Sequence, residues 1–123
     1  MQIFKTKWFS RFVQDEEITD ASLREAIRRT ESGLLDADLG GGLIKVRVAR
    51  KGQGRSGGYR MIVAYRAQGR AIFLYAFAKN ERENISTHEL KELRKIGLNW
   101  LSANSQALTK AIEEGKLQEI ENG

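Results

Sequence analysis

The chain has 123 residues, a formal net charge of +5 and a sequence pI of about 9.7, and 41% of its residues are hydrophobic. This composition is sufficient for a folded core and argues against a disordered chain. Because the chain has no cysteine and a single histidine, His88, disulfides and the usual cysteine- or histidine-rich metal sites are excluded. We expect neither a metal nor a cofactor.

The sequence also argues against a membrane protein. No apolar run approaches the ~18 residues that a membrane span needs. Residues 1–5 lack the hydrophobic segment of a signal peptide. We therefore expect a cytoplasmic protein with no membrane partner.

The positive charge is concentrated in the middle of the chain. Residues 39–80 contain no aspartate or glutamate, so this segment carries +9 while the two flanks together carry −4. Such a separation of charge predicts a polyanionic partner, most commonly one that presents phosphate. The alternative is a basic face that is simply exposed to water. The nine basic residues are Lys45, Arg47, Arg50, Lys51, Arg55, Arg60, Arg66, Arg70 and Lys79.

The N-terminal third predicts one strand and two helices. Residues 2–7 are predicted as the strand, and the hydrophobic residues from Trp8 to Val13 then recur at helical spacing. A second helix is expected to begin near Thr19 or Asp20, which are both preferred N-cap residues, and to end at Gly33.

Three antiparallel strands are predicted in the middle third of the chain. A flexible glycine segment, residues 40–42, precedes the first of them. In the first strand, Ile44, Val46 and Val48 alternate with Lys45 and Arg47, which gives one apolar and one mostly basic face. A glycine-rich basic loop at residues 51–58 follows. Residues 59–67 and 70–78 are the next two strands, and a tight turn at residues 68–69 joins them.

The C-terminal third predicts helices. Ser86 and Glu89 have the spacing of a capping box and begin a long amphipathic helix. A further helix is expected over residues 105–114, with Gly115 as its end, and residues 116–121 form either a small extra strand or a frayed tail. We expect one domain over residues 1–123, with residues 103–123 as a C-terminal extension.

The predicted order is β-α-α-β-β-β-α. It indicates an α+β fold in which two N-terminal helices and a C-terminal helix pack on one face of an antiparallel sheet. The other face can then stay open to water, and it carries the basic side chains.

Three cations on that open face form the first candidate site. Lys45 and Arg47 are two residues apart on one strand and therefore project from the same face. An antiparallel neighbour can place Arg60 beside them. Three cations at this spacing repel one another unless an anion lies between them, so the pattern predicts a phosphate cradle. The alternative is three separately solvated charges.

Two further segments are candidates for contacts with a polyanion. Glycines in residues 51–58 allow backbone N–H groups to approach an anion, although an ordinary hairpin loop explains them equally well. Lys79, at the end of the last predicted strand, is placed to reach the basic face. Glu81 is better explained as a salt-bridge partner than as a general base, and a tyrosine such as Tyr59 can stack on a base.

Residues 43–65 and 72–85 carry a resemblance to a known family. The first run places Gly58-Tyr59-Arg60 before an apolar strand, and the second ends in Lys79-Asn80-Glu81-Arg82. Together they resemble the central hairpin of RelE/HigB toxins, and the element order agrees over about residues 1–102. The resemblance implies a type II toxin–antitoxin toxin, a metal-independent endoribonuclease (mRNA interferase) that cleaves mRNA in the ribosomal A site and inhibits translation. It also implies a helix-turn-helix antitoxin of the HigA type, through which the complex binds operator DNA.

The resemblance also implies roles for individual residues. The scissile phosphate would be surrounded by catalytic residues, and neighbouring residues would contact the RNA. The catalytic residues that the resemblance implies are Lys45, Arg47, Arg60 and Lys79, with Asn80 next to Lys79. We further predict that the RNA is bound by Arg50, Lys51, Arg55, Tyr59 and Asn80.

This chain departs from the best-known RelE members at two positions. Asn80 stands where those members have an arginine, and Ser86 stands where they place a tyrosine. The general base is therefore unidentified, and two other functions stay open. One is a ParE-like toxin that blocks a protein target such as DNA gyrase. The other is a relative that binds RNA or the ribosome without cleaving.

Overall fold

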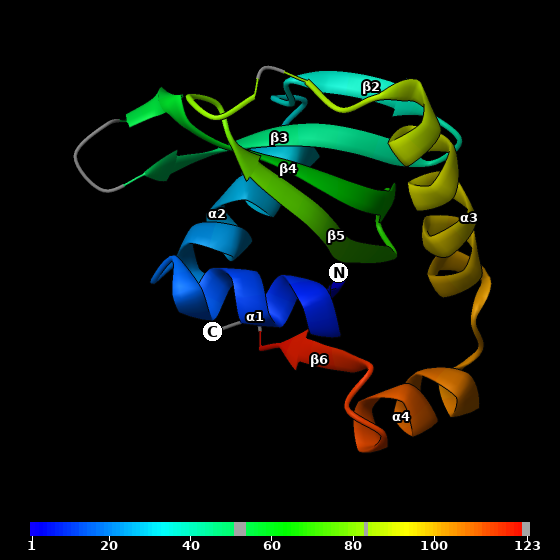
Figure 1. Ribbon diagram of the computed structural model, residues 1–123. Helices are drawn as coiled ribbons and strands as arrows, with labels where there is room; N and C mark the ends of the chain where they lie inside the picture. Colours follow the sequence, from blue (N-terminus) through cyan, green and yellow to red (C-terminus); the bar gives the residue numbers. More distant parts are fainter. Residues whose placement is uncertain (51–53, 83, 122–123) are drawn as a thin grey trace.

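The computed structural model describes residues 1–50, 54–82 and 84–121, without the side chains of residues 54–56. These residues form a sheet with the strand order β2-β3-β4-β5-β1-β6, flanked by helices (Figure 1). In chain order the elements are β1 (Gln2–Thr6), α1 (Lys7–Asp15), α2 (Asp20–Glu31), β2 (Ala37–Gly40), β3 (Leu43–Arg50), β4 (Gly54–Arg66), β5 (Arg70–Ala78), α3 (Thr87–Ser102), α4 (Ser105–Glu113) and β6 (Leu117–Ile120).

Local sequence signals place the ends of several helices as predicted. The Thr19 hydroxyl accepts a hydrogen bond from the backbone N–H of Ser22 and caps α2. After this helix Gly33 adopts a φ of +89°, a backbone conformation that glycine reaches without a steric penalty. Ser86 and Glu89 form the predicted capping box at the start of α3. The observed bounds of β5 coincide with the predicted ones.

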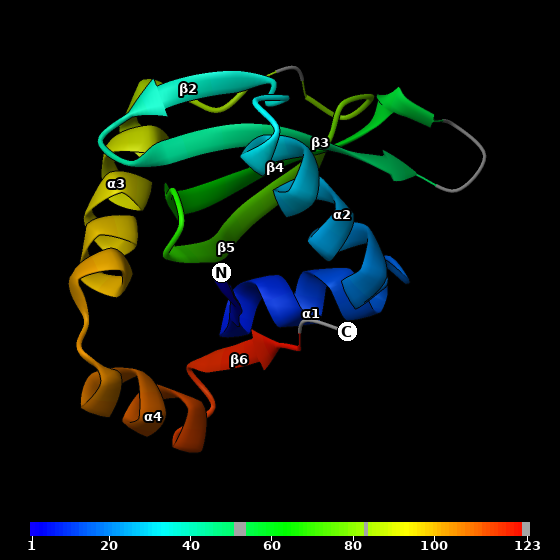
Figure 2. The same cartoon turned by 180° about the vertical axis from the view of Figure 1, so that it is seen from behind.

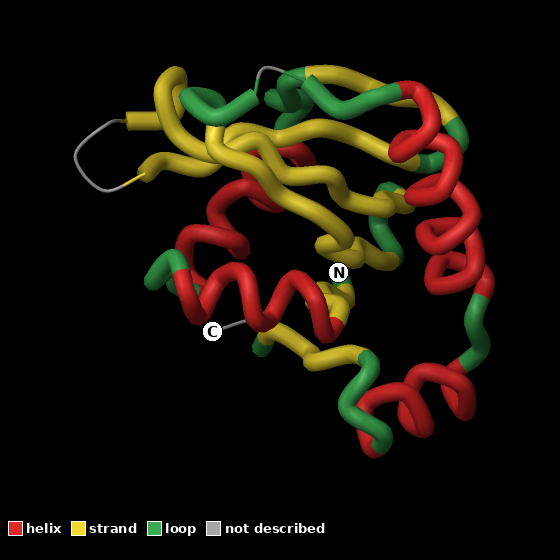
Figure 3. Tube along the Cα trace, viewed as in Figure 1, coloured by secondary structure: helices red, strands yellow, loops and turns green. Residues whose placement is uncertain are grey.

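The strand pairing is richer than predicted. Strand β2 was not expected. It pairs with β3 through a turn at residues 40–42, where all three glycines have positive φ values. Strand β4 begins at Gly54, inside the predicted loop. Strand β6 pairs antiparallel with β1, which decides between a strand and a frayed tail, and α4 leads the chain back to that edge (Figure 3). Strand β1 runs parallel to β5, so the sheet is mixed.

The α+β class is confirmed, but the helices cover both faces of the sheet rather than one. Helices α1 and α2 pack on β5 and β3, on the side of the sheet away from α3 (Figure 2). They close a core that contains Phe9, Leu23 and Met61. Helix α3 packs on β4 and β5 from the other side and shares a second core with α4. The physical reason is that β4 and β5 are apolar on both faces, so each face needs a cover.

Helix α3 covers only part of its face, and this leaves room for the basic residues. Its Gly97 lies against Leu43 and Ala64, where an added Cβ would meet side-chain atoms at 3.0 and 3.1 Å. Lys45, Arg47 and Arg60 lie further along the same face of β3 and β4, beyond this contact. None of the described helices is long and apolar enough to cross a membrane.

Candidate active site

Three of the predicted cations converge on one carboxylate, that of Asp36. Lys45 Nζ lies 3.4 Å from Asp36 Oδ2, and Arg47 Nε donates a hydrogen bond to Asp36 Oδ1 at 2.6 Å. Arg60 Nε lies 3.7 Å from Oδ2. The sheet creates this convergence because Arg47 and Arg60 are directly paired across β3 and β4. We call Lys45, Arg47 and Arg60 the cationic cluster.

Asp36 is the residue of this site that sequence reasoning missed. It precedes the unpredicted strand β2, and its backbone N–H donates to the carbonyl of Lys45, which fixes the segment beside β3. In the sequence it lies just outside the acid-free stretch of residues 39–80. The one available signal was physical: three neighbouring cations need an anion among them, and Asp36 and Asp38 are the two nearest acids on the N-terminal side of residues 39–80.

Burial strengthens the electrostatics of this site. The Asp36 and Arg60 side chains are 10% and 4% exposed, whereas Arg47 is 48% exposed. Burial by itself raises the pKa of Asp36, but the hydrogen bond from Arg47 and the charges of Lys45 and Arg47 hold this pKa below its usual value. Burial, together with the charge of Arg47, lowers the pKa of Arg60. Asp36 is thus an anion near neutral pH, and a poor proton acceptor in this state.

The cluster opens to solvent next to Arg47. An open depression of about 470 Å³ is lined by Arg29, Leu34, Leu35, Asp36 and Arg47. Arg29 of α2 donates a hydrogen bond to the carbonyl oxygen of Arg47, and it was not among the predicted residues. A ligand from solvent can therefore contact Arg47 directly, whereas it contacts Arg60 only after it has entered the cluster.

The residues at the end of β5 do not join the cluster. Lys79 lies in the exposed turn after β5, where its backbone N–H donates to the carbonyl of Gly58. Among the described residues, no ion pair connects its side chain with Asp36. Arg50 and Asn80 form a separate contact, since Arg50 Nη1 lies 3.3 Å from Asn80 Oδ1. Arg50 also lies over the ring of Tyr59, 5.6 Å from its centroid.

Tyr59 is placed differently from the expectation. It lies in the core under α1 and α2, is 3% exposed, and its hydroxyl donates to Glu16 Oε1 at 2.7 Å. Burial and this partner raise its pKa to about 12. The ring is therefore closed to a stacked base. The reason is the alternation of β4: Tyr59 precedes Arg60, so the two side chains point to opposite faces. Lys51 lies outside the described residues, as does the side chain of Arg55.

This arrangement suits one singly charged oxyanion. Two guanidinium groups and an ammonium surround a single carboxylate, and guanidinium donors match carboxylate and phosphate oxygens alike. Residues 1–120 match the family model described as the RelE toxin of the RelE / RelB toxin-antitoxin system. The chain belongs to the RelE toxin family. It is therefore a toxin of a toxin–antitoxin system, a class that generally inhibits translation, and an antitoxin partner follows from this membership. The matched range of this toxin includes α4 and β6.

Proposed function

We propose that this toxin is a metal-independent endoribonuclease that acts in the cytoplasm on mRNA in the ribosomal A site, and that its cationic cluster holds the scissile phosphate. The observation that carries the proposal is the convergence of Lys45, Arg47 and Arg60 on the Asp36 carboxylate. A phosphodiester carries the same single negative charge as that carboxylate. A phosphate can therefore replace Asp36 without changing the charge balance of the cluster.

Displacement of Asp36 is part of the proposed binding step. The two anions compete for the same donors, so the carboxylate leaves when the phosphate enters. The open depression beside Arg47 gives the Asp36 side chain space to rotate toward solvent. Its backbone can stay in place, because the N–H of Asp36 remains bonded to the carbonyl of Lys45.

The proposed chemistry is an intramolecular transesterification. The ribose 2′-hydroxyl gives up its proton to solvent as its oxygen attacks the adjacent phosphorus. The bond from phosphorus to the 5′-oxygen breaks, this oxygen takes up a proton from solvent, and the products are a 2′,3′-cyclic phosphate and a 5′-hydroxyl. Arg60 and Arg47 stabilise the charge that develops on the phosphorane oxygens. Lys45 supports them, and Lys79 binds a flanking phosphate from the turn after β5. The ribosome contributes by aligning the substrate.

The partner is proposed to be a helix-turn-helix antitoxin of the HigA type. The support is the resemblance of residues 43–65 and 72–85 to RelE/HigB toxins. A small helix-turn-helix gene beside the toxin gene, whose product co-purifies with the toxin and restores growth, is the expected finding. An antitoxin of another fold would remove this part of the proposal.

Substitution of Arg60 tests the nuclease proposal. We expect Arg60→Ala to fold and to lose toxicity and mRNA cleavage, measured by growth after induction and by primer extension on a reporter message. Arg66→Ala is the matched control, since Arg66 lies on the same strand and face but donates to the carbonyl of Leu101 instead. Full cleavage by Arg60→Ala would remove the site assignment. Growth arrest by the wild type with intact mRNA would favour a protein target or simple ribosome binding.

A further inference from the structure

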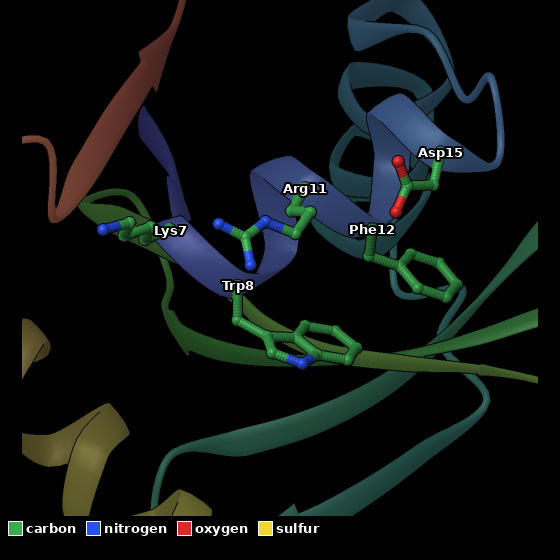
Figure 4. A pocket seen from close by; sticks show the side chains of 5 residues that line it. All are labelled: Lys7, Trp8, Arg11, Phe12 and Asp15. Atoms are coloured by element: carbon green, nitrogen blue, oxygen red, sulfur yellow. The ribbon is translucent and has the colours of Figure 1, made fainter.

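A second surface feature is the contact between exposed Trp8, at the start of α1, and partly buried Tyr75 of β5. Trp8 is 47% exposed, and its ring centroid lies 4.7 Å from that of Tyr75 on β5. Trp8 also stacks with Phe12, with centroids 5.4 Å apart and an interplanar angle of 11°. Figure 4 shows the indole extending from α1 beside β5, with Lys7 and Arg11 on the same flank of the helix. The aromatic rings are thus accompanied by two exposed cations.

A β-bulge turns Tyr75 toward the face of the cationic cluster. Val63 pairs with Phe73 and Ile62 pairs with Tyr75, so Leu74 is the extra residue. In a regular strand Tyr75 would point to the same side as Phe73, into the core under α1 and α2. The bulge instead places Leu74 and Tyr75 together against the α3-side core. Bulges of this kind are known to re-aim side chains near functional sites.

The pairing register of β3, β4 and β5 gives the distance between Tyr75 and the cationic cluster. Lys45 pairs with Ile62, and Ile62 pairs with Tyr75, so these three residues form one row across the sheet. Two strand spacings separate Lys45 from Tyr75, which is about 10 Å. A stacked nucleic-acid strand carries one phosphate per ~3.4 Å, so this distance corresponds to about three nucleotides. Trp8 lies in α1 and contacts the ring of Tyr75.

We propose that Trp8, backed by Tyr75, is a stacking site for an unpaired nucleobase of the RNA whose phosphate lies in the cationic cluster. This inference rests on the proposed function and extends it from one phosphate to a bound single strand. Single-stranded RNA is held in this manner elsewhere, by cations along the backbone and aromatic rings under the bases. Lys7 and Arg11 provide the charge complementarity to the phosphates that flank the stacked base. Trp8 and Phe12 line a separate open depression with Lys7 and Arg11, and its one acid, Asp15, lies at the opposite end of α1 from Lys7 and Trp8.

Trp8 itself reports on the proposed contact. The chain has two tryptophans, so Trp100→Phe leaves Trp8 as the single indole fluorophore. The probe is a hexanucleotide with every 2′-hydroxyl methylated, which the proposed chemistry cannot cleave. We expect this hexanucleotide to quench Trp8 emission on binding, whereas inorganic polyphosphate, which has no bases, binds without quenching.

Affinity for the same hexanucleotide gives an independent measurement. We expect Trp8→Ala to weaken its binding by about tenfold, the effect typical of a lost base–aromatic stack, and to leave the affinity for inorganic phosphate unchanged. Leu98→Ala, which removes a side chain of α3 that is 62% exposed, is the matched control and should bind like the wild type. Trp8→Phe should restore part of the affinity.

The outcomes separate this inference from the proposed function. If the hexanucleotide binds and Arg47→Ala weakens it, but Trp8 is not quenched and Trp8→Ala binds normally, the stacking site is wrong and the phosphate site stands. If neither the hexanucleotide nor inorganic phosphate binds to the wild type, both proposals fall. Quenching by the antitoxin but not by RNA would assign the Trp8 surface to a protein partner and overturn the inference.

Discussion

Met61 and Arg60 are neighbours on β4, yet they belong to two different environments. Met61 is fully buried in the apolar core that α1 and α2 close. Arg60 is nearly as buried, but its neighbours are Lys45, Arg47 and Asp36 on the face that α3 covers only in part. One face of the sheet is therefore filled with apolar side chains, and part of the other contains a cluster of charges. Substitutions on the first face should change stability, and substitutions in the cluster should change binding.

The largest effect on stability is expected from the closed face. Met61→Ala should lower the free energy of unfolding by about 2–5 kcal/mol, because it leaves a cavity in a packed core. Urea denaturation measures this change. At temperatures where the variant stays folded, its affinity for a methylated hexanucleotide should match the wild type. A large loss of affinity in the folded variant would mean that the two faces are not independent.

Asp36→Asn should change stability and binding in opposite directions. The variant keeps the shape of the side chain but leaves three cations without their anion, so at low salt we expect a loss of about 1–3 kcal/mol in stability. Because the internal competitor is gone, the hexanucleotide should bind about tenfold more tightly, a change of about 1.4 kcal/mol. Calorimetric titration measures this affinity. If the only role of Asp36 is to hold the segment before β2 in place, the affinity for the hexanucleotide will stay the same or fall.

Tyr59→Phe tests whether Tyr59 acts as a core residue or as an RNA-binding residue. Loss of the hydrogen bond to Glu16 should cost about 0.5–1.5 kcal/mol in stability, with no change in RNA affinity. Since folding raises the pKa of Tyr59 to about 12, its contribution is present below the unfolded value of about 10. That contribution is lost as the pH rises from there toward 12. Denaturation curves at pH 8 and pH 11 should therefore differ less for the variant than for the wild type.

The smallest effect at neutral pH concerns the start of α3. Arg82 and the cap at Ser86 lower the pKa of Glu89 to about 2. The contribution of Glu89 to stability is therefore present above its ordinary pKa of about 4.5 and is lost as the pH falls toward 2. Thermal unfolding followed between pH 6 and pH 2.5 should show this loss in the wild type and a weaker loss in Glu89→Gln. Equal slopes would contradict the role of the Arg82–Glu89 pair.

The sequence predicted the parts that depend on local patterns. The alternation of Lys45 and Arg47 and the pairing with Arg60 were correct, because side-chain direction in a strand has a period of two. The same rule places the side chains of Tyr59 and Arg60 on opposite faces of the sheet. The sequence alone was therefore enough to exclude Tyr59 from the RNA-binding surface. The N-caps of α2 and α3, at Thr19 and Ser86, are local signals as well and were placed correctly.

The parts that depend on distant contacts were missed. Asp36 reaches the cluster only because the short strand β2 pairs with β3, and a four-residue strand that ends in glycine carries a weak signal. The parallel pairing of β1 with β5, and the cover on both faces, depend on elements far apart in the sequence. The bulge at Leu74 could not be predicted from the local sequence either, since residues 70–78 are almost uniformly apolar.

The most direct test is a crystal structure of the toxin with the methylated hexanucleotide bound. We expect a phosphate within hydrogen-bonding distance of both Arg47 and Arg60, in the position of the Asp36 carboxylate, with the Asp36 side chain turned toward the depression beside Arg47. An RNA bound elsewhere while Asp36 still contacts Lys45, Arg47 and Arg60 would contradict it.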